Sequence, residues 1–298
     1  MPENNMNISN WISENTESLA GKTVAVTGST GGLGRALCDN LASLGASLVL
    51  VDRNEKRSAL HGAELKKKYG IDVRFITCDM EDFVSVKTAC EELKKIVPDI
   101  LILNAGAYKI PRRICETGFD NSFQINFVSP YYLAREMLPT VREKHGRIVA
   151  VGSVAHNYSK SDPDDIDFRN NKRASRVYGN AKRYLMCSLW ELFKDETEAS
   201  LSVVHPGITV TNITTHYPKP IYFFIKYPMK LFFMSPKKAC LSLLRGVFEP
   251  CEYNEWIGPR RFNVWGFPKK SKVTTCTLEE CREIGARADR IYYSLKSE

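Results

Sequence analysis

Sequence features typical of secreted, membrane-spanning and metal-binding proteins are missing from this chain. Residues 1–20 contain three Glu, no Lys or Arg and no apolar core, so we expect neither a secretory signal nor an N-terminal membrane anchor. The longest apolar stretch, Ile221–Met234, is 14 residues long and is interrupted by Lys226, Pro228 and Lys230. It is too short and too interrupted to span a bilayer, which needs about 20 apolar residues.

Cysteine pairs with CxxC spacing are also absent, although the 298 residues include nine Cys. The five His are scattered without metal-ligand spacing. We therefore expect reduced thiols, a cytoplasmic location and no metal site. The formal net charge of +8 is mild and falls short of the clustered positive charge of a nucleic-acid-binding surface, so we expect no nucleic-acid partner. It is compatible with an anionic ligand or an acidic membrane surface.

From Lys22 onward, short apolar runs alternate with segments of helix length. Thr23–Thr27 is apolar and β-branched, and Ser47–Val51 is almost continuously apolar, as in a parallel strand buried on both faces. Helix-length segments separate these runs from further strands predicted at 73–77, 100–103, 147–151 and 201–204. This alternation predicts an α/β fold, a Rossmann-like doubly wound parallel sheet flanked by helices. We expect one domain over residues 21–298, preceded by an extension at 1–20.

The helices are predicted from apolar periodicity and from capping residues. Gly45 should end the first helix, while Asn54 should cap a helix that ends near Gly70. Further helices are predicted at 82–97, 119–138, 178–193 and 278–295. A last strand is predicted around Trp256.

A glycine cluster, Thr27–Gly34, lies where the first predicted strand turns into the first helix. Glycines at such a turn let the backbone approach a pyrophosphate, whose charge is favoured at the helix N-terminus. Asp52, at the end of the second strand, is the acidic residue that such a dinucleotide site requires. The spacing is TGxxxGxG and differs from the GxGxxG pattern.

Further motifs follow at successive strand ends, and together they carry a family resemblance. The chain resembles a classical short-chain dehydrogenase/reductase of the retinol-dehydrogenase-like branch, strongly over about residues 20–215. The motifs are TGxxxGxG at Thr27–Gly34, Asp79, the NAG run Asn104–Gly106, Asn126, Ser153, YxxxK at Tyr178–Lys182, and Pro206–Gly207 with Thr211 behind it.

The resemblance implies a hydride transfer between a nicotinamide cofactor and an alcohol or carbonyl. Tyr178 would act as the acid/base, and the Lys182 ammonium, one helical turn away, would favour the phenolate and bind the nicotinamide ribose. Ser153 would position the substrate oxygen, and Asn126 would hold a water in the proton relay. The residues implied in cofactor binding are Thr27, Gly28, Ser29, Thr30, Gly32, Leu33, Gly34, Asp52, Arg53, Asp79, Met80, Asn104, Ala105, Gly106, Tyr178, Lys182, Pro206, Gly207, Ile208 and Thr211.

The choice between the two nicotinamide cofactors turns on Asp52 and Arg53. A carboxylate at the position of Asp52 accepts ribose hydroxyls and repels a 2′-phosphate, which favours NAD. Arg53 follows directly, and in NADP-using relatives an Arg near this point binds that phosphate. The glycine loop holds no basic residue. We therefore expect NAD in preference to NADP.

Two sequence features point to a lipophilic substrate. Ser153 and Tyr178 are 25 residues apart, and the intervening segment resembles that of retinol-dehydrogenase-like members. Residues 212–235 are expected to form a helical substrate lid rich in Tyr and Phe, with Lys219, Lys226 and Lys230 among them. This segment is interpreted as a hydrophobic lid, as an interfacial helix that contacts a membrane through 217–234, or as helices packed on the core or on another protein.

Two other functions remain open. One is a reductase or epimerase of the same fold that acts on a polar or sugar substrate, and the other is a dinucleotide-binding sensor or scaffold without turnover. The aromatic lid argues against the first, and the intact Ser153, Tyr178 and Lys182 argue against the second. The resemblance also allows a homodimer.

Overall fold

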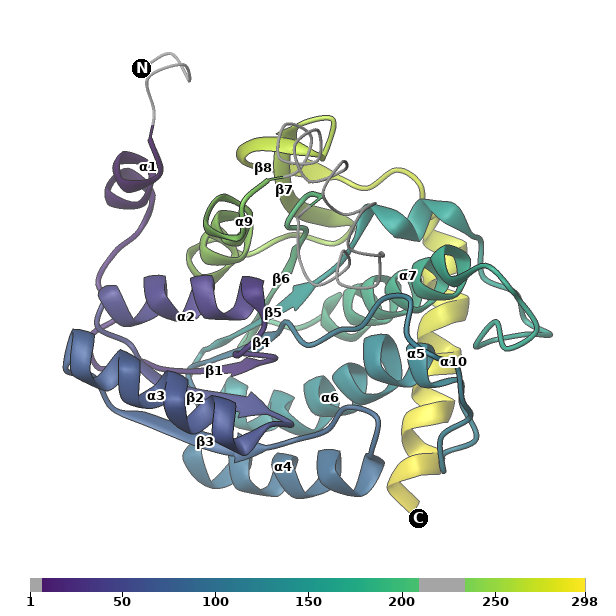
Figure 1. Cartoon of the computed structure of the whole chain (residues 1–298). Coiled ribbons are helices and arrows are strands. Elements are labelled where there is room, and N and C mark those ends of the chain that lie inside the picture. The colour runs from purple at the N-terminus through teal and green to yellow at the C-terminus, as the bar shows by residue number, and fades with distance from the viewer. Residues whose placement is uncertain (1–6, 209–233, 298) are drawn as a thin grey trace, which may run out of the picture.

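The computed structural model describes residues 7–208 and 234–297. The described residues form an eight-stranded sheet in the order β3-β2-β1-β4-β5-β6-β7-β8 (Figure 1). Strands β1 to β7 are parallel to their neighbours, and β8 pairs antiparallel with β7. The α/β doubly wound prediction is confirmed. The strands are β1 (Thr23–Thr27), β2 (Ser47–Asp52), β3 (Val73–Thr77), β4 (Ile100–Leu103), β5 (Arg147–Val151), β6 (Ser200–Val204), β7 (Glu255–Arg261) and β8 (Trp265–Lys272).

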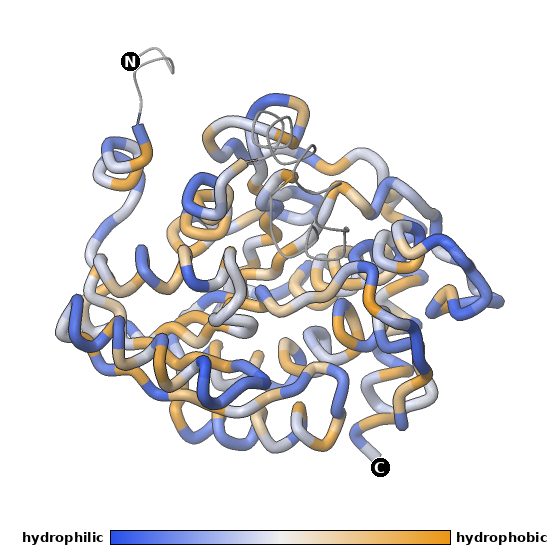
Figure 2. Tube along the Cα trace, viewed as in Figure 1, coloured by the Kyte–Doolittle hydropathy of each residue, from blue (hydrophilic) through white to orange (hydrophobic). Residues whose placement is uncertain are grey.

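Helices cover both faces of the sheet, and each face has its own apolar core. One face packs against α1 (Ile8–Asn15), α2 (Gly32–Ser43), α3 (Glu55–Tyr69) and α9 (Pro236–Phe248). The other packs against α4 (Phe83–Ile96), α6 (Ser129–Arg142), α7 (Ala174–Phe193) and α10 (Leu278–Ser297). In Figure 2 the apolar residues follow the strands and the inward sides of the helices. This pattern explains why the central strands β1 and β4 read as continuous apolar runs.

Capping residues fix several helix ends where the sequence predicts them. The Asn54 side chain accepts a hydrogen bond from the backbone N–H of Arg57 at 3.0 Å, and Gly70 ends α3 in the left-handed conformation at φ +68°. Asp82 caps α4 by accepting from Val84 and Ser85. After these helices, β3 pairs in parallel with β2, and β4 pairs in parallel with β1.

The structure differs from the predicted elements in several places, among them the short helices α1 and Val154–Tyr158, which the sequence analysis did not include. The helix expected at 119–138 consists of α5 (Asn121–Phe123), a π-helical turn (Gln124–Val128) and α6. Helix α7 begins at Ala174, four residues before Tyr178. Helix α9 and strand β8 were not predicted. The sequence of β8, WGFPKKSK, lacks the alternation of apolar and polar residues that marks an antiparallel strand.

The part of the N-terminal extension that the structure describes packs on the sheet domain. Trp11, in α1, is 3% exposed, and its ring stacks on Phe267 of β8 with centroids 6.3 Å apart. Leu19 donates a backbone hydrogen bond to Leu44 at 2.8 Å. The division into an extension at 1–20 and a domain at 21–298 stays a prediction. Among the described residues, no helix combines the length and apolarity needed to cross a membrane.

The predicted lid at 212–235 and the predicted membrane-contact segment at 217–234 lie outside the described residues, except for Met234 and Ser235. Met234 is buried, and its backbone N–H donates to the carbonyl of Ile208 at 3.0 Å. Ser235 caps α9.

Replacement of Trp11 tests the contribution of the N-terminal helix. We expect Trp11→Ala to lower the free energy of unfolding by about 3 kcal/mol, because it removes a buried aromatic side chain from a packed contact. Trp11→Phe should recover most of the loss. Thermal or denaturant unfolding measures both variants. An unchanged stability of Trp11→Ala would contradict the packing of α1 on β8.

Candidate active site

The predicted site residues gather at the carboxyl ends of the central parallel strands. The strand order reverses between β1 and β4, and in open α/β sheets ligands bind at this point. The glycine turn follows β1, the NAG run follows β4, and Ser153 follows β5. Pro206–Gly207 follows β6. The topology therefore brings motifs that are up to 180 residues apart in the sequence to one edge of the sheet.

Close backbone contacts explain the glycines of the turn. Gly28 has φ +66°, and a Cβ on it would lie 2.9 Å from the Cα of Ala105. A Cβ on Gly34 would lie 2.2 Å from the carbonyl oxygen of Gly28. Any side chain at either position would therefore displace the turn. The turn leads into the N-terminus of α2 at Gly32, whose free N–H groups and dipole favour an anion.

Asn104 holds this turn in place from the neighbouring strand. Its Nδ2 donates to the carbonyls of Thr27 and Gly28 at 2.8 and 3.1 Å. The Thr27 hydroxyl oxygen in turn accepts from the backbone N–H groups of Asn104 and Ala105, both at 3.0 Å. The Asn104 side chain thus holds the loop in place through contacts inside the protein. These contacts are separate from any that the Asn104 backbone makes with a cofactor.

Asp52 lies against the same turn, as its place at the end of β2 predicts. Its Oδ2 accepts from the backbone N–H of Thr30 at 2.8 Å and from the Ser29 hydroxyl at 3.3 Å. Arg57, which belongs to none of the sequence motifs, donates through Nη2 to the carbonyl of Thr30 at 3.0 Å. A carboxylate and a guanidinium therefore both border the loop, while Arg53 is exposed.

Asp79 and Met80 form the loop after β3. Asp79 Oδ1 accepts from the backbone N–H of Glu81 at 3.0 Å, which closes the turn. Met80 is 6% exposed, and its carbonyl accepts from the Ser129 hydroxyl at 2.6 Å. These contacts connect the loop to α6. A direct contact of either side chain with a cofactor stays a prediction.

Tyr178, Ser153 and Lys182 come together as the YxxxK spacing predicts. The Ser153 side chain lies close enough to the Tyr178 hydroxyl to lower its pKa. Lys182 is 2% exposed, and its Nζ lies 5.8 Å from the Tyr178 ring centroid and donates to the carbonyl of Val151 at 2.8 Å. The two side chains thus share one face of α7, which turns toward the end of β5.

The direction of the Tyr178 pKa differs from the expectation drawn from Lys182. Burial raises the pKa of Tyr178 to about 12, against a smaller lowering by the neighbouring Ser153 side chain. Burial also lowers the pKa of Lys182 to about 8. In the protein without cofactor, desolvation is the largest influence on the pKa of Tyr178, and it favours the protonated phenol.

Asn126 lies in the π-helical turn, and its side-chain amide is fully engaged by the protein. Its Nδ2 donates to the carbonyls of Ala107 and Ser122, each at 2.8 Å, and its Oδ1 accepts from the N–H of Ala107 at 3.1 Å. A Cβ on Gly106 would lie 2.8 Å from Asn126 Oδ1 and 3.6 Å from Lys182 Nζ. Asn126 thereby anchors the loop after β4 beside Lys182, and its predicted role in holding a water stays a prediction.

Two residues near the reacting groups belong to none of the sequence motifs. The ring of Tyr108 meets that of Tyr178 edge-on, with centroids 5.2 Å apart. His156 Nδ1 lies 2.7 Å from the carbonyl of Ser153, and its Nε2 lies 2.7 Å from the hydroxyl of Thr275. Metal-ligand spacing, the signal used for His, does not identify a histidine that orients a neighbouring loop.

The segment after β6 is described as far as Ile208. Gly207 has φ +79°, and a Cβ on it would lie 2.7 Å from the carbonyl oxygen of Val264. Ile208 is 37% exposed. Thr211 lies outside the described residues, so its predicted contact with the nicotinamide carboxamide stays a prediction.

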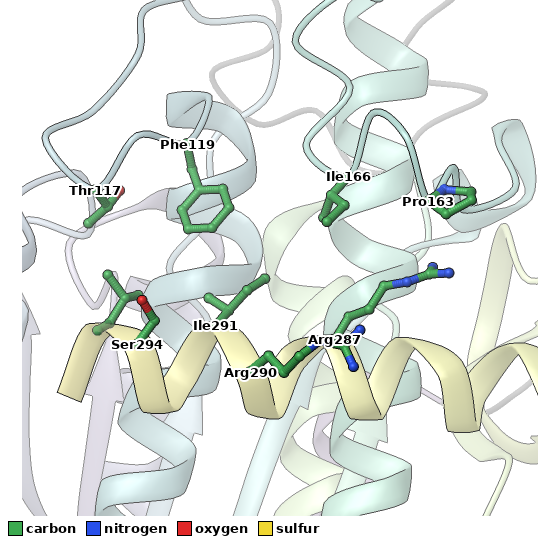
Figure 3. A pocket seen from close by; sticks show the side chains of 9 residues that line it. Thr117, Phe119, Pro163, Ile166, Arg287, Arg290, Ile291 and Ser294 are labelled. Carbon is green, nitrogen blue, oxygen red and sulfur yellow. The ribbon is translucent and has the colours of Figure 1, made fainter. Parts of the chain in front are cut away.

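A separate cavity of about 570 Å³ lies between α10 and two loops (Figure 3). Figure 3 shows Arg287, Arg290 and Ile291 on α10 facing Phe119 and Ile166 on the loops. None of its lining residues belongs to the predicted cofactor or catalytic set. Within the described part of the chain, no group of His, Cys, Asp and Glu could hold a metal ion.

The residues around the glycine turn fit a dinucleotide. Gly28 and Gly34 permit a tight turn in which backbone packs directly on backbone, and the N-terminus of α2 that follows offers N–H groups to a pyrophosphate. Asp52 borders the turn from the end of β2. The fold and this site together define a dinucleotide-binding oxidoreductase.

Comparison with known proteins gives the family. The short chain dehydrogenase family model matches residues 22–162. Retinol dehydrogenase 14 of Mus musculus is 28% identical over 267 residues, 80% of this chain and 80% of that protein. An uncharacterized oxidoreductase of Schizosaccharomyces pombe is 30% identical over 235 residues, 72% of this chain and 68% of that protein. The chain belongs to the short-chain dehydrogenase/reductase family of NAD(P)-dependent oxidoreductases.

A solved structure with the same fold comes from Mycobacterium paratuberculosis. This uncharacterized protein has a TM-score of 0.75 and 20% sequence identity, and the alignment covers 95% of this chain and 97% of that one. At this identity the likeness bears on the fold alone.

Replacement of Asn104 tests its part in holding the glycine turn. We expect Asn104→Ala to weaken cofactor binding about tenfold, since the carbonyls of Thr27 and Gly28 lose their donor and the turn loosens. Fluorescence titration with NADH and NADPH measures the dissociation constants. Asn40→Ala is the matched control, because it removes an amide that bonds to Ala36 of α2 and to Cys240 of α9, away from the turn. Equal affinities for Asn104→Ala and wild type would contradict this role.

Proposed function

We propose that this protein interconverts an alcohol and a carbonyl group on a lipophilic substrate, with Tyr178 as the acid/base. The observation that carries the proposal is the grouping of Tyr178 and Ser153 at the carboxyl end of β5, with the buried Lys182 Nζ 5.8 Å from the Tyr178 ring centroid. The bound nicotinamide cofactor, NAD or NADP, supplies or accepts the hydride. The roles of these residues are carried over from the family resemblance and agree with this arrangement.

In carbonyl reduction, Tyr178 donates a proton to the oxygen of the substrate. Its raised pKa keeps the phenol protonated at neutral pH, as a general acid requires. The Ser153 hydroxyl, which lies beside Tyr178, orients the same oxygen. Lys182 lies within reach to stabilise the phenolate that proton donation leaves behind.

In alcohol oxidation the same phenol must first lose its proton. Because burial raises the pKa of Tyr178, oxidation by this site favours alkaline pH, and reduction favours neutral pH. Bound cofactor changes the charge at the site and therefore the balance between the two directions. The direction of the reaction follows the cofactor ratio and the substrate.

A lipophilic substrate is supported by the relative that acts on retinol and by residues near Tyr178. Tyr108 offers an aromatic surface edge-on to the Tyr178 ring. The segment at 212–235 carries many Tyr and Phe, and we propose it as the lid over the substrate. Peripheral membrane contact through 217–234, a cytoplasmic location and homodimer formation are parts of the same proposal.

NAD is proposed as the preferred cofactor because Asp52 borders the glycine turn. Its carboxylate would repel a 2′-phosphate and accept the hydroxyls of the adenine ribose. Arg53 and Arg57 are the residues that would favour NADP instead. Arg57 already donates to Thr30, which occupies part of its hydrogen-bonding capacity.

The acid/base assignment is tested by Tyr178→Phe. We expect at least a thousandfold loss of kcat, because the phenylalanine ring has no proton to donate while filling the same space. Cofactor affinity should stay within about threefold. A panel of steroids, retinoids, fatty aldehydes and sugars, run with NADH and NADPH, gives the rates. Tyr184→Phe, which alters a neighbouring tyrosine of α7, is the matched control. Retained turnover in Tyr178→Phe would refute the assignment.

The cofactor preference is tested by Asp52→Ser. We expect wild type to have the higher kcat/KM with NAD, and the variant to shift the ratio toward NADP by about tenfold or more, since the repelling charge is gone. Steady-state kinetics with both cofactors measure the ratio. A wild-type preference for NADP would overturn the argument from Asp52.

A further inference from the structure

Three cysteine thiols meet where the segment before the C-terminal helix crosses the catalytic helix. Cys187 belongs to α7, Cys281 to α10, and Cys276 to the loop that leads into α10. The Sγ atoms of Cys281 and Cys187 are 2.8 Å apart. Cys276 adjoins both of the other thiols, which lower the pKa of its own thiol. The cluster therefore connects the helix of Tyr178 and Lys182 to the C-terminal segment.

Arg183, the residue after Lys182, places a positive charge beside this cluster. Its Nη1 lies 3.3 Å from Cys276 Sγ and pairs with Glu280 at 2.6 Å, and it also donates to the carbonyl of Thr275 at 3.1 Å. The two neighbouring thiols and the charge of Arg183 lower the pKa of Cys276, against the opposing effect of burial. The thiolate is the nucleophilic form of cysteine, so Cys276 is the sulfur of the three that is best placed to react first.

Metal binding and simple core packing fit the three thiols less well than redox chemistry does. The described residues contain no group that could hold a metal ion. An isolated buried cysteine behaves as a small apolar side chain, as Cys90 does, where burial raises the thiol pKa. Cys276 differs because the Arg183 guanidinium donates to its Sγ at 3.3 Å and two further thiols adjoin it.

We propose that Cys187, Cys276 and Cys281 form a redox site, at which hydrogen peroxide oxidises two thiols to a disulfide that joins α7 to the C-terminal segment through Cys187. The Cys276 thiolate attacks one peroxide oxygen, the O–O bond breaks, and hydroxide leaves and takes up a proton as water. The sulfur of Cys187 then attacks the Cys276 sulfenic acid, the S–O bond breaks, and the thiol proton leaves with the hydroxyl as a second water. Two thiols thus lose two electrons to one peroxide.

Cys281 can then take part by thiol–disulfide exchange. Its Sγ can attack Cys187 in the new disulfide, which releases Cys276 as the leaving thiolate. A thiol of low pKa is the better leaving group, so the bond moves toward the Cys187–Cys281 pair. Either product links α7 to the C-terminal segment. The disulfide also restrains the active site, because Thr275 contacts His156 and the His156 ring contacts the carbonyl of Ser153.

Access of the oxidant requires local opening, because Cys187, Cys276 and Cys281 are 0%, 3% and 1% exposed. Hydrogen peroxide is close to water in size, so a small movement of residues 273–281 admits it. Oxidation should therefore be slow under native conditions and faster at urea concentrations below the unfolding transition.

The experiment treats the reduced full-length protein with hydrogen peroxide, blocks the remaining thiols by alkylation, and maps disulfides by mass spectrometry after trypsin. We expect peptide 184–194 linked to peptide 273–282, with a rise in Tm of about 5 °C that dithiothreitol reverses. Cys187→Ser should lose both the link and the rise. Cys90→Ser, which removes a buried cysteine outside the cluster, should keep both. Cys276→Ser should slow the linkage at least tenfold.

Two results would overturn the proposal, and neither depends on enzymatic activity. One is a disulfide confined to peptide 273–282, and the other is oxidation of wild type without any link between the two peptides. The peptide map of wild type decides the question even if Cys187→Ser fails to fold.

Discussion

The burial of the Lys182 ammonium is the constraint on which the site depends. A lysine that is 2% exposed lacks most of its hydration, and here its Nζ has the carbonyl of Val151 as a partner at 2.8 Å. Desolvation lowers the pKa of Lys182 to about 8 and raises that of Tyr178 to about 12. The two groups are thereby held in an apolar setting, where the charge of a bound cofactor or a substrate oxygen acts with little screening.

The carboxyl edge of the sheet assembles this setting from separate loops. Asn104 ties the loop after β4 to the glycine turn after β1, and Asn126 ties the same loop to the π-helical turn. His156 and Arg183 extend the network to the C-terminal segment through Thr275. Residues outside the reacting group therefore fix much of the geometry, and two of them, Asn104 and Asn126, are amides bonded to backbone groups.

The sequence was sufficient for the parallel strands and for the grouping of Ser153, Tyr178 and Lys182. Buried parallel strands are continuous apolar runs, and the YxxxK spacing places two side chains on one helix face. The sequence alone was insufficient for features that depend on tertiary contacts. Strand β8 forms because it pairs with β7, although WGFPKKSK lacks alternation. The pKa direction of Tyr178 depends on desolvation, which residue spacing does not reveal.

A spectrophotometric titration of tyrosine ionisation tests the central claim most directly. The tyrosinate absorbance of Tyr178→Phe is subtracted from that of wild type across a pH series, in the absence and presence of NAD. The account predicts that Tyr178 of the cofactor-free protein stays protonated up to at least about pH 10, as its buried phenol requires. Ionisation of Tyr178 near pH 7 without cofactor would contradict it, because attraction to Lys182 would then outweigh burial.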